Sequence, residues 1–197
     1  MRAIEAIRDE RVVAVLRRVA DVPRVVAALR VGGIRIFEIT LDSADALEAI
    51  ARLRSNPELV VLAGTVRTAV DVDNAAAAGA EACVSPVLVP EVVERSRSVG
   101  VPAIPGTLTP SEIEAASRLG AAMVKLFPAS LGGPPYVRDV LAPLADVPLL
   151  ATGGVDAANA SAFLRAGAAA VAVGTALVGA TDPAAAAREL VGSARDA

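Results

Sequence analysis

The stretch "RLGAAMVKLFP" (residues 118–128) contains the repeating unit that decides the fold of this chain. Its first three residues are typical of the end of a helix, which stops at Gly120, and the apolar run that follows has the length of one buried strand. The same succession of glycine and apolar run occurs in "AAGAEACVSP" (77–86) and "RAGAAAVAVG" (165–174). A module of roughly 20–25 residues, made of one strand and one helix, therefore recurs along the chain.

The number of these modules indicates which architecture they form. Strands that are apolar on both faces and alternate with helices form parallel sheets. Eight units predict an α/β fold, a closed (β/α)8 TIM barrel, in which residues 1–10 form a short N-terminal helix and residues 1–197 form a single domain. An open doubly wound sheet is the alternative, but no glycine-rich loop follows the first run to mark a nucleotide crevice. The eight apolar runs are residues 12–17, 34–40, 59–66, 81–86, 101–106, 121–128, 148–154 and 168–177.

The composition excludes several classes of function. The sequence contains no histidine, so a Ser-His-Asp or Cys-His nucleophile and a histidine-ligated metal site are impossible, and we expect no metal. Cys83 is the one cysteine, and without a histidine to activate it we interpret it as a structural thiol. The net charge of −3 gives no reason to expect nucleic acid or a membrane surface as a partner. Neither a signal peptide nor an apolar stretch of membrane-spanning length is recognisable, so we expect a cytoplasmic protein.

Lys125 is the only lysine of the chain, and it lies inside an apolar run. The period of two residues in a strand places Met123, Lys125 and Phe127 on one face, with Val124 and Leu126 on the other. Active sites in (β/α)8 barrels lie at the C-terminal ends of the strands, so the amine is expected inside the barrel near its mouth. Burial disfavours the charged form of an amine, and a neutral amine attacks carbonyl carbons to form Schiff bases.

Glu38 is a second charged side chain in an apolar run, "IRIFEIT" (34–40). A carboxylate beside the amine of Lys125 could shuttle protons for carbonyl chemistry. Alternatively, the two side chains form a buried ion pair that is purely structural. A Lys–Glu pair poised for proton transfer has the same appearance, so the sequence leaves both interpretations open.

Two strand ends that contain glycine form a candidate phosphate site. They are "TGG" (152–154) and "GT" (174–175), which end the seventh and eighth runs. Loops at these positions of a barrel commonly bind phosphate, because glycine leaves the backbone N–H groups accessible. Arg17 ends the first run and adds a cation for a carboxylate or a phosphate, unless it is an ordinary surface arginine.

In combination and order, these motifs resemble those of a known family. The stretches "VVAVLR", "GGIRIFEITL", "AGTV", "VKLFPAS", "GGPPYVRDV" and "TGGV" are similar to those of the class I aldolases that cleave 2-keto-3-deoxy-6-phosphogluconate (KDPG), also known as 4-hydroxy-2-oxoglutarate aldolases. The resemblance runs almost from end to end. It implies a (β/α)8 barrel, a homotrimer, a reaction without metal or other cofactor, and a keto acid or sugar phosphate as the small-molecule partner.

The resemblance also implies a role for each matching residue. Lys125 would form the Schiff base with pyruvate or the keto substrate, and Glu38 would move protons through water. Arg17 and Thr65 would hold the carboxylate region, or Arg17 would reach the phosphate instead. The remaining residues fall into two groups: Pro86 and Phe127 would line the pyruvate pocket, and Thr152, Gly153, Gly154, Gly174 and Thr175 would hold the phosphate end.

Some positions depart from the family pattern. Asp42 occupies the place where many members have an arginine that grips the carboxylate, which shifts this role to Arg17 and to backbone N–H groups. The stretch "LDS" (41–43) is also similar to "LNS" of the related 6-phosphogalactonate aldolases. Those relatives have valine at the position of Thr152, so this residue favours the gluconate epimer. Val87 stands where glycine is frequent.

The predicted function is a Schiff-base aldolase, a lyase that splits KDPG into pyruvate and D-glyceraldehyde 3-phosphate. The galactonate epimer and 4-hydroxy-2-oxoglutarate, which would yield pyruvate and glyoxylate, are alternative substrates. A phosphate-binding barrel isomerase, in which Lys125 acts only through its charge, belongs to a different class. A catalytically inactive barrel kept as an oligomeric scaffold is a further alternative, which the complete set of lysine, glutamate, threonine and "TGG" disfavours.

Overall fold

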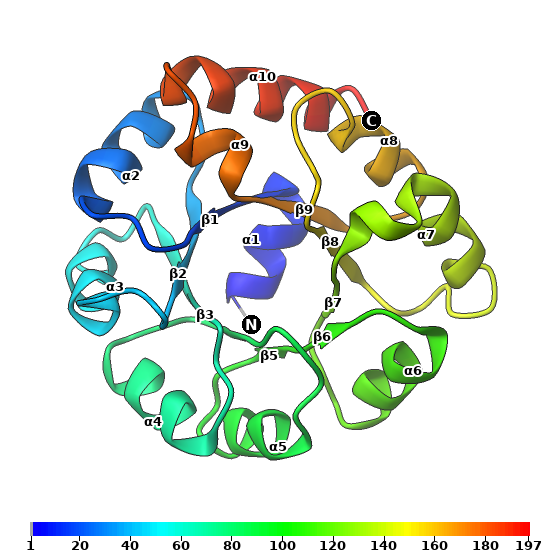
Figure 1. Cartoon of the computed structure of the whole chain (residues 1–197). Helices are drawn as coiled ribbons and strands as arrows, with labels where there is room; N and C mark the ends of the chain where they lie inside the picture. Colours follow the sequence, from blue (N-terminus) through cyan, green and yellow to red (C-terminus); the bar gives the residue numbers. More distant parts are fainter. Residues whose placement is uncertain (1) are drawn as a thin grey trace.

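The computed structural model describes residues 2–197 and shows a ring of parallel strands surrounded by helices (Figure 1). The strands pair in the order β5-β4-β3-β2-β1-β9-β8-β7-β6, and every neighbouring pair is parallel. The strands are β1 (Val12–Leu16), β2 (Ile36–Thr40), β3 (Val60–Gly64), β4 (Cys83–Val84), β5 (Ala103–Ile104), β6 (Gly106–Thr107), β7 (Val124–Leu126), β8 (Leu149–Thr152) and β9 (Ala170–Val173).

The barrel closes at Pro105, which separates β5 from β6. Proline has no backbone N–H and interrupts the strand, so the predicted run 101–106 appears as two strands of two residues each. The ladder nevertheless continues on both sides. The Ile104 carbonyl accepts from the Ser85 N–H at 3.2 Å, and the Pro105 carbonyl accepts from the Lys125 N–H at 2.9 Å. The nine strands thus fill eight positions, which confirms the predicted (β/α)8 barrel and excludes the open sheet.

The helices begin and end where the sequence supplies suitable residues. The Asp21 carboxylate accepts from the Arg24 N–H at 3.0 Å and starts α2, and Thr109 forms a capping box with Glu112 at the start of α6. The helices are α1 (Arg2–Glu10), α2 (Val22–Val31), α3 (Ala46–Arg54), α4 (Ala69–Ala77), α5 (Pro90–Ser98), α6 (Pro110–Arg118), the 3-10 turn η1 (Ala129–Leu131), α7 (Gly133–Leu141), α8 (Ala160–Arg165), α9 (Thr175–Val178) and α10 (Pro183–Arg195).

The predicted N-terminal helix is α1, which lies within the ring of strands in Figure 1. Its buried residues Ala3 and Ile7 pack with the side chains that fill the barrel interior. The guanidinium of Arg2 donates to the carbonyls of Pro57 and Leu59, just before β3 begins. Helix α1 therefore covers the N-terminal end of the barrel and leaves the C-terminal end, the mouth, open for a site.

Two apolar layers fix which side chains face the barrel interior. Met123 belongs to the interior layer, whereas its neighbours Val124 and Leu126 pack in the outer layer between strands and helices. The predicted alternation along β7 is thereby confirmed. It places Lys125 on the interior face, one step closer to the mouth than Met123.

Candidate active site

Lys125 and Glu38 meet inside the barrel near its mouth. The amine Nζ on β7 lies 3.7 Å from Oε1 of Glu38 on β2, and the side chains are 5% and 0% exposed. This separation is longer than a normal hydrogen bond. Neither carboxylate oxygen of Glu38 has a hydrogen-bond partner within residues 2–197. A buried carboxylate without donors is costly, so this group is suited to accept a proton or a hydrogen bond from a ligand.

Gly64, at the end of β3, makes room for the carboxylate of Glu38. A Cβ atom at this position would lie 2.3 Å from Oε1 and 2.7 Å from Cγ of Glu38. No side chain fits at that distance, so the carboxylate can lie against β3 only while residue 64 is glycine. Gly64 is not among the site residues predicted from the sequence. A glycine inside an apolar strand run was the available signal.

Phe127 lies beside the amine and completes this part of the site. Its ring centroid is 5.3 Å from Nζ of Lys125, within the range of a cation–π contact. Phe127 is half-buried, and it directly follows the end of β7. The amine thus has an aromatic ring and one carboxylate as neighbours.

A cavity of about 870 Å³ opens at the mouth, within the range of small-molecule sites. We call it the mouth cavity. It brings together side chains and turns from β1, β7, β8 and β9. The predicted site residues that line it are Arg17, Lys125, Phe127, Thr152, Gly153, Gly154, Gly174 and Thr175, and Arg18 and Asp156 line it as well.

Arg17 is the one cationic side chain of the mouth cavity without a charged partner within residues 2–197. Lys125 pairs with Glu38, Arg18 pairs with Asp42 at 3.4 Å, and the carboxylate of Asp156 accepts backbone N–H groups of its own turn. The guanidinium of Arg17 contacts only the hydroxyl of Thr65, at 3.4 Å. It is therefore available to bind an anion.

Thr65 follows β3 in a strained backbone conformation. Its φ is +60°, in the left-handed region that β-branched residues rarely adopt. Such strain persists where the surrounding structure or a functional requirement holds it. Here it accompanies the contact between the threonine hydroxyl and Arg17 at the rim of the mouth cavity.

Asp42 stands where the family resemblance leads us to expect an arginine, and the structure shows which contacts it makes instead. Its carboxylate pairs with Arg18, and the neighbouring Ser43 hydroxyl accepts from the Arg18 N–H at 2.8 Å. Arg18 has a φ of +52°. These contacts join the turns after β1 and β2, and they keep Arg18 occupied while Arg17 stays unpaired. The sequence analysis did not identify Arg18 or Ser43, because their pairing depends on two turns that meet only in the fold.

Three predicted site residues do not line the mouth cavity, namely Glu38, Thr65 and Pro86. Glu38 and Thr65 contact residues that do line it, Lys125 and Arg17 respectively, whereas Pro86 is placed differently. It follows β4 and is half-buried, but it is not among the residues that line the mouth cavity. Its carbonyl packs against Gly106, where a Cβ atom would lie 2.2 Å from that oxygen. The neighbouring Val87 is 55% exposed, and nothing in the structure explains why it replaces the frequent glycine.

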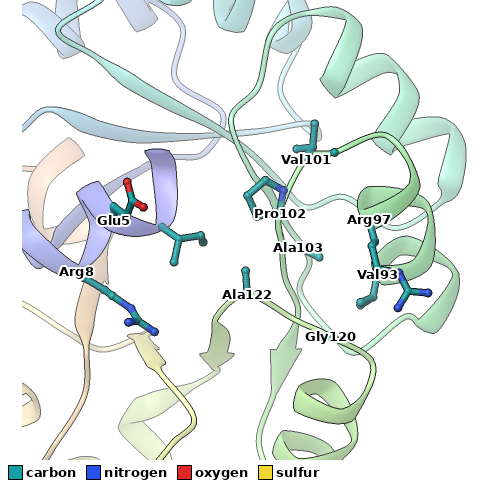
Figure 2. Close-up of a pocket in the computed structure, with 11 residues that line it drawn as sticks. Glu5, Arg8, Val93, Arg97, Val101, Pro102, Ala103, Gly120 and Ala122 are labelled. Atoms are coloured by element: carbon teal, nitrogen blue, oxygen red, sulfur yellow. The ribbon is translucent and has the colours of Figure 1, made fainter. Parts of the chain in front are cut away.

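A second cavity, of about 460 Å³, lies at the opposite end of the barrel. Figure 2 shows Glu5 and Arg8 of α1 on one side of it, and Val93 and Arg97 of α5 on the other. None of the predicted site residues lines this cavity. The amine of Lys125 lines the mouth cavity, and the carboxylate of Glu38 lies beside that amine, so neither group belongs to the second cavity.

Other features of the chain do not point to a different kind of site. Burial raises the pKa of the Cys83 thiol to about 11, which keeps it protonated and supports its structural interpretation. Residues 2–197 contain no group of three or more Cys, Asp and Glu side chains arranged to hold a metal ion. Across the same residues, no helix has the length and apolar character needed to cross a membrane.

The comparison with known families agrees with this geometry. The model of the KDPG and KHG aldolase family matches residues 3–187. The chain belongs to this family. The chain is 40% identical over 164 residues to 2-dehydro-3-deoxy-phosphogluconate aldolase of Treponema pallidum, an alignment that covers 81% of this chain and 78% of the relative. Members of the KDPG and KHG aldolase family are aldolases, so the chain is a lyase.

Solved structures of the same family are similar over nearly the whole chain. One is the 2-keto-3-deoxy-6-phosphogluconate aldolase of Zymomonas mobilis with 3-phosphoglycerate, with 28% identity, a TM-score of 0.86 and coverage of 98% of this chain and 95% of that one. Another is the KDPG aldolase of Legionella pneumophila with pyruvate captured as a covalent carbinolamine, with 25% identity, a TM-score of 0.84 and coverage of 100% and 98%.

Proposed function

We propose that this chain is a class I aldolase that cleaves KDPG into pyruvate and D-glyceraldehyde 3-phosphate. The observation that carries the proposal is the only lysine of the chain, buried 3.7 Å from an otherwise unpartnered carboxylate at the floor of the mouth cavity. Family membership supports the substrate class, and the carbinolamine in the Legionella pneumophila relative supports covalent chemistry with pyruvate.

In the proposed mechanism, Nζ of Lys125 attacks the C2 carbonyl of the substrate, and loss of water from the carbinolamine gives an iminium ion. Glu38 removes the proton of the C4 hydroxyl, directly or through water, and the C3–C4 bond breaks. The electron pair of that bond moves to C3 as the iminium becomes an enamine, and the aldehyde leaves. The proton held by Glu38 then returns to C3, and water releases pyruvate from the amine.

We propose that the two anionic ends of the substrate lie on opposite sides of the amine. Arg17 is the unpaired cation of the mouth cavity and lies beside Thr65, on the β3 side of β1. It is suited to the carboxylate of the pyruvate portion. The glycine turns after β8 and β9 are suited to the phosphate. The Zymomonas mobilis relative was solved with 3-phosphoglycerate, a molecule that has a carboxylate and a phosphate.

The same proposal includes a cofactor-free reaction in a cytoplasmic homotrimer. The iminium formed on Lys125 is itself the electron sink, so the cleavage does not require another electrophile. The trimer is inferred from the family resemblance alone. Analytical ultracentrifugation of the purified protein tests the trimer. We expect a single species with the mass of three chains, and a monomer at the assay concentration would contradict the trimer.

A direct assay tests the substrate. Purified protein is mixed with KDPG, and the release of pyruvate is followed with a coupled dehydrogenase, with the Lys125→Arg variant as control. Release by the wild type and none by the variant is expected, with the same rate in the presence of a metal chelator. Release that persists in Lys125→Arg would favour a mechanism in which this residue acts only through its charge.

The galactonate epimer is a second candidate substrate, because "LDS" (41–43) is similar to the corresponding stretch of 6-phosphogalactonate aldolases. Comparing kcat/KM for the two epimers decides between them. We expect a preference for the gluconate form, in line with Thr152 at the end of β8. Equal or reversed preference would identify the galactonate form as a substrate.

A further inference from the structure

We propose that Asn159 is a positioning residue that holds the turn after β8 in the shape that receives the phosphate group of the substrate. This inference rests on the proposed function, because it deepens the role of the phosphate end of the mouth cavity. The turn comprises residues 153–156, all of which line that cavity. Asn159 itself does not line it, so its effect would pass through the turn.

The side-chain amide of Asn159 binds the turn at two points. Its Nδ2 donates to the carbonyl of Gly154 at 2.9 Å, and its Oδ1 accepts from the N–H of Asp156 at 3.0 Å. The two bonds enclose Val155 between them. The Asp156 carboxylate in turn accepts from the N–H of Asn159 at 3.1 Å, so hydrogen bonds join these two residues in both directions. Gly154, Asp156 and Asn159 are thus joined by a set of hydrogen bonds around Val155.

The position of Asn159 in the chain makes this arrangement notable. It is the residue that precedes helix α8, where asparagine usually accepts a hydrogen bond from the first helical turn. Its side chain makes no such bond to α8. Both polar atoms of the amide are instead used on the turn. The side chain therefore fixes the loop rather than the helix.

The turn is also held from its other side, by β7 and the segment after it. Gly153 and Gly154 have φ values of +89° and +75°. A Cβ atom would lie 3.1 Å from the Phe127 ring at position 153 and 2.4 Å from Cβ of Ser130 at position 154. The Ser130 N–H donates to the Gly153 carbonyl at 3.0 Å. The turn is therefore confined between Ser130 and Asn159 and has little freedom to change shape.

This confinement leaves two backbone donors at the cavity wall. The N–H groups of Gly154 and Val155 donate to no protein atom within residues 2–197. Consecutive backbone N–H groups in such a turn form a concave site for phosphate oxygens. The Gly154 carbonyl and the Val155 N–H belong to one peptide group, so Asn159, which binds that carbonyl and the next N–H along the chain, fixes the orientation of the Val155 donor. The Gly154 N–H belongs to the preceding peptide group, whose carbonyl accepts from Ser130.

Kinetics of the Asn159→Ala variant test the proposal, with the affinity for pyruvate as an internal reference that involves no phosphate. We expect KM for KDPG to rise about tenfold, which corresponds to the loss of a few well-placed hydrogen bonds, with kcat within about twofold. Inhibition by inorganic phosphate should weaken in parallel. The pyruvate concentration that half-saturates borohydride trapping on Lys125 should not change.

Asn74→Ala is the matched control, because Asn74 lies on α4 and is exposed. It should change none of these quantities. Asn159→Ser keeps a residue suited to the start of a helix but cannot span the turn, so it should reproduce the KDPG-specific effect if Asn159→Ala does not fold.

The results separate this inference from the proposed function. Unchanged KM for KDPG in both variants, or an equal loss of affinity for KDPG and pyruvate, would overturn the positioning role. A wild-type protein that forms no adduct with pyruvate would overturn the proposed function itself. An adduct with pyruvate together with an unaltered response to phosphate would overturn the positioning role alone.

Discussion

At the scale of single residues, the account depends on the pair of Lys125 and Glu38. A structural ion pair and a catalytic pair look alike, but this pair is too far apart for a hydrogen bond and leaves both carboxylate oxygens of Glu38 unpartnered within residues 2–197. An ion pair that served only to stabilise the fold would contribute more free energy if the two groups were in closer contact and had additional hydrogen bonds. The observed geometry leaves the amine and both carboxylate oxygens free to bond with a substrate.

Changing Glu38 to glutamine separates proton transfer from Schiff-base formation. The amide keeps the shape of the side chain but cannot take the proton of the C4 hydroxyl. We expect Glu38→Gln to lower kcat for KDPG cleavage by about 10²–10⁴-fold. The lysine should still be trapped with pyruvate and borohydride, at a reduced rate. Unchanged kcat would assign the C4 proton to another group.

Strain at Thr65 predicts opposite effects on stability and affinity. Glycine adopts a φ of +60° without strain, so Thr65→Gly should raise the free energy of unfolding by about 1 kcal/mol in spite of the extra freedom of the unfolded chain. It should also raise KM, because the hydroxyl that contacts Arg17 is lost. Denaturant unfolding and steady-state kinetics measure the two effects. A less stable variant would show that the strain at this residue is not significant.

At the scale of elements, β3 supports the active site through Gly64. The carboxylate of Glu38 lies against its backbone, so we expect Gly64→Ala to move that carboxylate and lower kcat by about tenfold or more. The effect should depend on Glu38, and adding Gly64→Ala to Glu38→Gln should lower kcat little further. Gly192, in α10, has open space around it and no positive φ, so Gly192→Ala provides the control for replacing a glycine with alanine outside the site.

The capping box of α6 gives a prediction on pH dependence. Hydrogen bonds from the backbone N–H groups of Thr109 and Leu108, together with the Thr109 hydroxyl, lower the pKa of Glu112. The carboxylate therefore stabilises the fold at a pH above its ordinary pKa, and this contribution is lost as the pH falls through the lowered value. The difference in Tm between wild type and Glu112→Gln should be positive near neutral pH and shrink in acid. A difference independent of pH would contradict this.

The elements also show which parts of the site the sequence could predict. Strand periodicity placed Lys125 and Glu38 inside the barrel because side-chain alternation is a local property. A proline at position 105 predicts a break in the strand. That the barrel still closes at this point depends on hydrogen bonds to two other strands, which the sequence does not reveal. The pairing of Asp42 with Arg18 and the binding of the turn by Asn159 depend on loop shapes that no periodicity encodes.

At the scale of the whole molecule, the two ends of the barrel differ in structure, because one is covered by a helix and the other is open. Helix α1 covers the N-terminal end, and the Lys125 amine lines the cavity at the mouth. Ile7 of α1 is completely buried, so Ile7→Ala should lower the free energy of unfolding by about 2–5 kcal/mol. Because the helix is remote from the mouth, kcat/KM measured well below the melting temperature should stay within about twofold. A large loss of activity in a folded variant would show that the two ends are coupled.

One measurement tests the central claim most directly. The protein is incubated with pyruvate, reduced with borohydride and digested, and the modified peptide is identified by mass spectrometry. The account predicts a single reduced pyruvate adduct on Lys125, in the peptide that contains "MVKLFP", and none in the Lys125→Arg variant. An active protein whose Lys125 remains unmodified under these conditions would contradict the Schiff-base mechanism.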